Sequence, residues 1–310
     1  MKVAFVFPGQ GSQSVGMLDA WSGNATVASV IAQASEALGQ DLAGLIAGGP
    51  AEDLNLTTNT QPVMLASAVA MYRAWIDAGG QAPALVAGHS LGEYSALTAA
   101  GSIELADAVR VVRIRADAMQ TAVPVGTGGM AAILGLDDAT VLSVCEQAAQ
   151  GEVVEAVNFN APAQVVIAGS KAAVERACEL AKQAGAKRAL PLPVSAPFHS
   201  SLLRPAADTL QQALAGIQVS SPAVPLVNNV DVLSPADADA IRDALVRQAW
   251  RPVRWVEVIQ AMKAQGVTHI VECGPGKVLT GLTKRIDGDL VGLAITDPAS
   301  MQAALETLQG

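Results

Sequence analysis

The pentapeptide Gly-His-Ser-Leu-Gly at residues 88–92 constrains the fold of this chain more than any other segment. An apolar run suited to a buried strand precedes it at residues 84–87, and good helix formers follow at residues 93–100. Strand, sharp turn and helix form the context in which a Gly-x-Ser-x-Gly motif makes a nucleophile elbow. The glycines allow the tight turn, and the hydroxyl of Ser90 then projects above the sheet near helix amides. The alternative is an ordinary turn in which Ser90 only caps the helix.

The remaining pattern predicts an α/β protein that carries an inserted unit. Strands at residues 3–7, 225–229, 268–271 and 291–295 alternate with helical segments such as 60–77 and 105–119, which indicates a parallel sheet between helices. Residues 131–192 read strand, helix, strand, strand, helix, strand, the order of a ferredoxin-like unit. We therefore predict a hydrolase-like α/β catalytic domain of residues 1–122 and 196–310. A small ferredoxin-like α+β domain, residues 123–195, is inserted into it.

Composition excludes several classes of protein. With 310 residues, 51% of them hydrophobic, the chain can bury the core of about two domains. A net charge of −9 argues against nucleic acid as a partner. The longest uncharged stretch, residues 118–136, is interrupted by Pro124 and several glycines, so we expect no membrane span. The three cysteines are widely spaced and lack nearby histidines, which predicts free thiols, no metal site and a cytoplasmic location.

A serine nucleophile needs a base, and the chain has three histidines. His89 should point away from Ser90, and His269 lies in an apolar run where a structural role is favoured. His199 follows the inserted unit and is the candidate base, with a structural role as its alternative. A hydrolase-type triad would also need an acid between Ser90 and His199. The acids available there are Asp107, Asp137 and Asp138.

Two further features bear on the chemistry. The amide of Leu91 is one expected oxyanion donor, and the loop at residues 9–11 is the candidate for the second. A dinucleotide fingerprint is a weak alternative for that loop, because Ser14 replaces the third glycine. Arg115 lies on the apolar face of the helix at residues 105–119. A guanidinium that reaches water and one that is buried to bind a carboxylate both fit that position.

Separated motifs carry a resemblance to a known family over nearly the whole chain. They lie at residues 5–13, 88–94, 157–160, 198–200 and 272–276. In this respect the sequence resembles the malonyl-CoA:acyl carrier protein transacylases of bacterial fatty acid synthesis. The resemblance implies a ping-pong transfer of a malonyl group from malonyl-CoA to acyl carrier protein. Ser90 would carry the malonyl ester and His199 would act as the base.

The resemblance also implies individual roles. Gln10 and Leu91 correspond to the oxyanion-hole donors, and the backbone carbonyl of Gln248 would orient His199 in place of a triad acid. The substrate-binding positions that it implies are Arg115, which grips the free malonyl carboxylate, Gln248, Asn160 and Phe198. It implies no metal and no cofactor, since CoA and 4′-phosphopantetheine are parts of the substrates, and a monomer is the expectation.

Two alternatives stay open. A serine thioesterase or hydrolase would share Ser90 and His199 but would resolve the acyl-enzyme with water. The same transferase could serve a carrier protein of polyketide synthesis or of malonate decarboxylase. Because carrier proteins are acidic, docking would need a local basic patch. The candidates for that patch are Lys182, Lys187, Arg188, Arg251 and Arg254.

Overall fold

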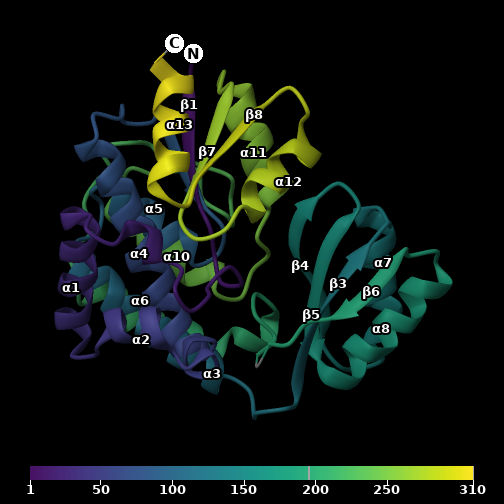
Figure 1. Ribbon diagram of the computed structural model, residues 1–310. Helices are drawn as coiled ribbons and strands as arrows, with labels where there is room; N and C mark the ends of the chain where they lie inside the picture. The colour runs from purple at the N-terminus through teal and green to yellow at the C-terminus, as the bar shows by residue number, and fades with distance from the viewer. Residues whose placement is uncertain (195, 310) are drawn as a thin grey trace.

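The computed structural model describes residues 1–194 and 196–309, and these form two separate sheets (Figure 1). The parallel sheet has the strand order β2-β1-β7-β8, with β1 at Val3–Phe7, β2 at Leu85–Gly88, β7 at His269–Cys273 and β8 at Val291–Ile295. The antiparallel sheet has the order β4-β5-β3-β6, with β3 at Gly128–Leu134, β4 at Val154–Ala161, β5 at Gln164–Ser170 and β6 at Arg188–Pro191.

Helices make up most of the rest of the described chain (Figure 1). Before the antiparallel sheet come η1 (Asp19–Trp21), α1 (Ala25–Leu38), α2 (Leu42–Gly48), α3 (Ala51–Leu54), α4 (Thr57–Asp77), α5 (Gly92–Ala99) and α6 (Leu105–Thr121). Within that sheet's segment lie α7 (Asp138–Ala149) and α8 (Lys171–Gln183). After it come η2 (Ser201–Leu203), α9 (Pro205–Ala215), α10 (Ala238–Gln248), α11 (Trp255–Ala264), α12 (Val278–Ile286) and α13 (Pro298–Gln309).

Helices cover both faces of the parallel sheet. Successive side chains of a strand point to opposite faces, and in β1 the rings of Phe5 and Phe7 belong to a core shared with α1, α4, α5, α6 and α13. Ala4 and Val6 belong to a second core, which includes side chains of α11 and α12. This arrangement confirms the predicted α/β class with a parallel sheet between helices.

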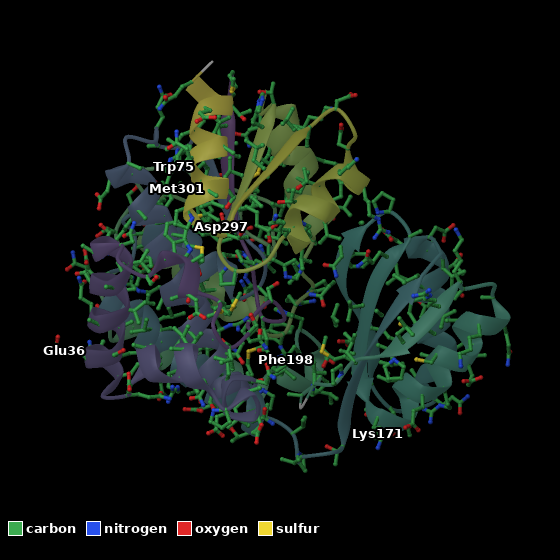
Figure 2. The ribbon with its side chains drawn as sticks, in the orientation of Figure 1. Glu36, Trp75, Lys171, Phe198, Asp297 and Met301 are labelled. Carbon is green, nitrogen blue, oxygen red and sulfur yellow. The ribbon has the colours of Figure 1, made fainter. Side chains whose placement is uncertain are left out.

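The antiparallel sheet has the predicted βαββαβ order and two different faces. Ala131 and Ile133 of β3 face a core formed with α7 and α8. Met130 and Val166, on the other face, form a cluster against which Phe198 packs. Figure 2 shows Phe198 beside the antiparallel sheet, on the side that faces the rest of the molecule. All four strands of this sheet fall within residues 123–195, and the predicted domain boundaries themselves stay a prediction.

Several elements differ from those expected. The strand predicted at residues 225–229 is reduced to a single bridge between Leu226 and Val86. The side chain of Asn228 accepts the amides of Asp231 and Leu233, which turns the chain away from the sheet edge. Helices α1, α2 and α3 were not anticipated, and α4 begins at Thr57, earlier than the predicted residue 60.

Pro62 lies inside α4 and helps to hold α6 beside it. A proline has no amide hydrogen, so the carbonyl four residues earlier loses its helical donor. That carbonyl belongs to Thr58, and it accepts a hydrogen bond of 2.7 Å from Nε of Arg113 on α6. The exchange links the two helices at the level of Arg115.

Among the described helices, none combines the length and the apolar character needed to cross a membrane.

Candidate active site

Ser90 sits on a turn that only glycine neighbours permit. Its backbone φ is 53°, a region that residues with side chains seldom adopt. A Cβ at Gly88 would lie 1.8 Å from the backbone of Gly92, and one at Gly92 would lie 2.0 Å from the carbonyl oxygen of Phe7. The turn therefore follows directly from the close approach of β1, β2 and α5, as the pentapeptide predicted.

We expect Gly88→Ala to destabilise the protein, because its new methyl group would overlap backbone that cannot move aside. Overpacking of this kind costs about 1–3 kcal/mol or more. The free energy of unfolding in urea measures the loss. Gly281→Ala is the matched control, since a Cβ there meets open space and alanine favours a helix by about 1 kcal/mol over glycine. Equal stability of Gly88→Ala and the wild type would contradict the close approach at the turn.

The imidazole of His199 lies against the Ser90 hydroxyl. Its Nε2 is 2.6 Å from Ser90 Oγ, and its Nδ1 is 2.8 Å from the backbone carbonyl oxygen of Gln248. That carbonyl can accept only a proton held on Nδ1, so Nε2 is left with a lone pair facing the hydroxyl. Burial, assisted by the charge of Arg115, lowers the pKa of His199 to about 3. The ring is therefore neutral at pH 7 and able to accept a proton.

The other histidines are placed away from this pair. Nε2 of His89 lies 2.7 Å from Oδ1 of Asn160 on β4, and its ring packs 5.4 Å from that of Trp255. His269 begins β7, at the end of the sheet opposite the elbow, and its Nδ1 contacts the hydroxyl of Thr268.

The acids considered as triad members do not orient His199, whose Nδ1 contacts the backbone carbonyl of Gln248. The side chain of Asp137 accepts the amide of Thr140 and caps α7, and Asp107 forms an ion pair with Arg110. Asp138 lies in the first turn of α7, which packs on the antiparallel sheet. The orienting group beside His199 is a backbone oxygen, which supports the imidazolium less than a carboxylate would.

Arg115 is buried, with only 2% of its surface exposed. Nη1 donates to Gln61 at 2.8 Å, and Nη2 donates to Gln248 at 3.0 Å and to Ser90 Oγ at 3.1 Å. The acceptors are neutral, and Nε is a buried atom without a hydrogen-bond partner among the described residues. The interpretation in which the guanidinium reaches water is therefore wrong. Burial lowers the pKa of Arg115, so the site favours an anion beside the guanidinium.

A cavity of about 360 Å³ opens over these groups between the two sheets. Gln10, Leu91, Asn160 and Phe198 all line it, together with Ser90, Arg115 and His199. Leu91 precedes the first turn of α5, and the side chain of Gln10 donates to Thr57 at 3.3 Å. The structure thus brings every predicted site residue except Gln248 to the cavity wall. Gln248 is fully buried behind His199 and Arg115.

Three buried polar residues of the site were missed by the sequence reasoning: Gln61, Glu93 and Asn229. Gln61 accepts from Arg115. Asn229 accepts the amide of Ser90 at 2.8 Å and donates to the carbonyl of Gly88 at 2.7 Å, so it holds the backbone that enters the elbow. Asn229 ends the segment predicted as a strand at residues 225–229, and a polar residue at the end of a predicted strand was the available signal.

The charged side chains bear on two kinds of site, a metal site and a docking surface. In the described part of the chain, no group of three or more His, Cys, Asp or Glu side chains could hold a metal ion. Of the candidate docking cations, Lys182 pairs with Glu179 and Arg254 with Glu257, while Arg251 stacks on Trp250. Among the described residues, Lys187 and Arg188 are exposed and form no ion pair.

Comparison with known proteins decides the family. The model of the acyl transferase domain matches residues 4–286. The chain belongs to this family. It is 60% identical over 304 residues to the malonyl CoA-acyl carrier protein transacylase of Escherichia coli (strain K12), an alignment that spans 98% of each chain. The resemblance predicted from the separated motifs is thereby confirmed.

Solved acyltransferase structures agree over the whole chain. The acyl-carrier-protein S-malonyltransferase of Burkholderia pseudomallei 1710b superposes with a TM-score of 0.98 at 67% identity, covering 99% of this chain and 100% of that one. A malonyl-transacylase solved in complex with its type II PKS acyl-carrier protein superposes with a TM-score of 0.98 at 53% identity, covering 99% and 100% of the two chains. The hydrolase-like fold with its second sheet is therefore shared with these enzymes.

Proposed function

We propose that this protein transfers the malonyl group of malonyl-CoA to the phosphopantetheine thiol of acyl carrier protein, and so supplies fatty acid biosynthesis. One observation carries the proposal: the Ser90 hydroxyl lies between a neutral imidazole at 2.6 Å and a buried guanidinium at 3.1 Å. The imidazole suits a hydroxyl that must become a nucleophile. The guanidinium suits an acyl group that ends in a carboxylate. Membership of the acyl transferase family and the names of the relatives support the same activity.

In the first half-reaction, Ser90 Oγ attacks the thioester carbonyl carbon of malonyl-CoA while its proton passes to Nε2 of His199. The carbonyl oxygen becomes an oxyanion, for which the backbone amides of Gln10 and Leu91 are the proposed donors. Collapse of the tetrahedral intermediate breaks the carbon–sulfur bond. The proton on His199 passes to the departing sulfur, which leaves as CoA thiol, and the malonyl ester of Ser90 remains.

The second half-reaction runs these steps in the opposite direction with a new thiol. The phosphopantetheine thiol gives its proton to His199 and attacks the ester carbonyl carbon. The new intermediate breaks its bond to Ser90 Oγ, which recovers the proton from His199. Free enzyme and malonyl-carrier thioester are the products. CoA and 4′-phosphopantetheine take part only as portions of the substrates, so we propose that no further cofactor is needed.

The remaining site residues hold the acyl group and the base. We assign to Arg115 the free carboxylate of malonate, which its planar fork can bind through two hydrogen bonds. The backbone carbonyl of Gln248 keeps the His199 proton on Nδ1. Asn160 and Phe198 are proposed to contact the substrate from the wall opposite the elbow. We further propose that the protein works as a monomer in the cytoplasm.

Intact-protein mass spectrometry tests the proposal. Mixing the enzyme with malonyl-CoA should add one malonyl group, and holo acyl carrier protein should remove it and gain the same mass. Apo carrier protein, which lacks the thiol, is the control and should leave the adduct in place. Rapid release of free malonate without carrier protein would contradict transfer and would indicate a hydrolase. A parallel series with a polyketide carrier protein identifies the preferred acceptor.

A further inference from the structure

Glu93 follows the elbow on α5, and its carboxyl group is 1% exposed behind the reacting atoms. One oxygen, Oε2, accepts two hydrogen bonds from residues far away in the sequence. The backbone amide of Asn229 donates to it at 2.9 Å, and Nε2 of Gln248 donates at 3.1 Å. The other oxygen, Oε1, is buried without a hydrogen-bond partner within the described residues. A buried carboxyl group held in this way is costly, since burial disfavours its charge.

The hydrogen bond from Gln248 decides which way that side-chain amide faces. Nε2 of Gln248 donates both to Glu93 and to the carbonyl oxygen of Ser90 at 2.9 Å, so Oε1 is left to accept from Nη2 of Arg115. A reversed amide would set an NH₂ group against the guanidinium, donor against donor. The backbone carbonyl of the same residue receives Nδ1 of His199. Glu93 therefore holds Gln248, a residue that contacts both the base His199 and the guanidinium of Arg115.

The hydrogen bond from Asn229 acts on the nucleophile itself. Its amide N–H is held by Glu93, while its side chain accepts the amide of Ser90 and donates to the carbonyl of Gly88. These two contacts hold the backbone that leads from Gly88 into Ser90, whose φ is strained. The loop that carries Asn229 thus depends on the same carboxylate oxygen as Gln248.

We propose that Glu93 is a positioning residue for the acyl transfer, acting through Gln248 and Asn229. The inference rests on the proposed function, because it concerns the acylation of Ser90. In this proposal the Glu93 carboxylate keeps three groups aligned: the Ser90 hydroxyl, the His199 imidazole and the Arg115 guanidinium. No single local segment could align these groups alone. Misplacement of a reacting group by about 1 Å is enough to slow a reaction about 100-fold.

The ionisation of Glu93 offers a readout of this role. Burial raises its pKa to about 7, opposed by the hydrogen bonds from Gln248 and Asn229. The charged and titratable groups that face it are Arg115 from α6, which lowers its pKa, Asp231, which raises it and is itself paired with Arg247 of α10, and Tyr94 of its own helix. The ionised form balances the guanidinium and accepts two N–H donors, so acylation should slow as the pH falls through about 7. His199, with a pKa of about 3, adds no step between pH 6 and 8.

Glu93→Ala and Glu93→Gln test the inference by single-turnover acylation with malonyl-CoA, measured by rapid quench and intact mass. We expect Glu93→Ala to acylate about 100-fold more slowly than the wild type. Glu93→Gln keeps an oxygen that can accept from the two donors, so it should acylate at least about tenfold faster than Glu93→Ala. Unlike the wild type, its rate should not fall as the pH drops below 7. Ser95→Ala, which alters a buried hydroxyl on the same helix, is the matched control and should acylate at the wild-type rate.

The outcomes separate this inference from the proposed function. A wild-type enzyme that malonyl-CoA does not acylate would refute the function itself. A normally acylated wild type alongside a Glu93→Ala variant within twofold of its rate would overturn the role of Glu93. If Glu93→Ala does not fold, Glu93→Gln decides alone, because a wild-type pH profile in that variant would also overturn the inference. Active-site titration corrects each rate for unfolded protein.

Discussion

Ser90→Ala is expected to leave no malonyl adduct after incubation with malonyl-CoA, and to abolish transfer to acyl carrier protein. The alanine side chain has no atom that can carry the ester, so the loss is complete. His199→Ala should keep the nucleophile but lose its base, and acylation should slow by about 10²–10⁴-fold. Intact mass after timed quenching measures both variants. The residual rate of His199→Ala should rise with pH as hydroxide replaces the imidazole.

His269→Ala is the matched control for the histidine variant, because that ring lies at the opposite end of the parallel sheet. It should acylate at the wild-type rate. A stable malonyl adduct on Ser90→Ala, located by peptide mapping to another residue, would refute the assignment of the nucleophile. An unchanged rate in His199→Ala would remove the imidazole from the proton transfer.

Arg115→Ala is expected to change the choice of acyl group. The kcat/KM for malonyl-CoA should fall roughly 30- to 5,000-fold, because the variant lacks the buried partner of the malonyl carboxylate. This fall corresponds to a loss of about 2–5 kcal/mol of interaction. Acetyl transfer should fall little or rise, since acetyl-CoA leaves the wild-type guanidinium without its anion, a cost that the variant no longer carries. The measurement is the ratio of kcat/KM for malonyl-CoA to that for acetyl-CoA.

Arg110→Ala controls for the loss of an arginine from the same helix. Its guanidinium pairs with Asp107 and donates to the backbone carbonyl of Ala37, away from the cavity. The selectivity ratio should stay unchanged in this variant. Arg115→Lys keeps the charge without the two-pronged fork and should give an intermediate ratio. Equal losses for malonyl-CoA and acetyl-CoA in Arg115→Ala would contradict a carboxylate site at Arg115.

Those parts of the fold that depend on short-range pattern were predicted well. Short apolar runs identified the strands at 3–7 and 291–295, and the elbow was predicted from residues 84–100 alone. The failures lie where tertiary contacts replace local signals. The segment at 225–229 has an apolar pattern suited to a strand. However, the side chain of Asn228 accepts a hydrogen bond within a turn, and that of Asn229 accepts one from the elbow. Helices α1 and α2 do carry local signals, which the prediction did not use: Asn24 caps α1 and Gly39 ends it, and Asp41 caps α2 and Gly49 ends it.

The sequence by itself predicted the sharp turn at Ser90, because its flanking glycines leave room for close backbone: a Cβ at Gly88 would lie 1.8 Å from Gly92. It also determined the membership of the family, through motifs spread along the chain. Only the tertiary structure decided that Arg115 is buried and that Glu93 contacts both Gln248 and Asn229, whereas the resemblance already implied the backbone oxygen of Gln248 beside His199. Ser90 lies 109 residues from His199 and 158 from Gln248 in the sequence. Contacts of that range are set by how helices pack on the sheet, which local spacing does not encode.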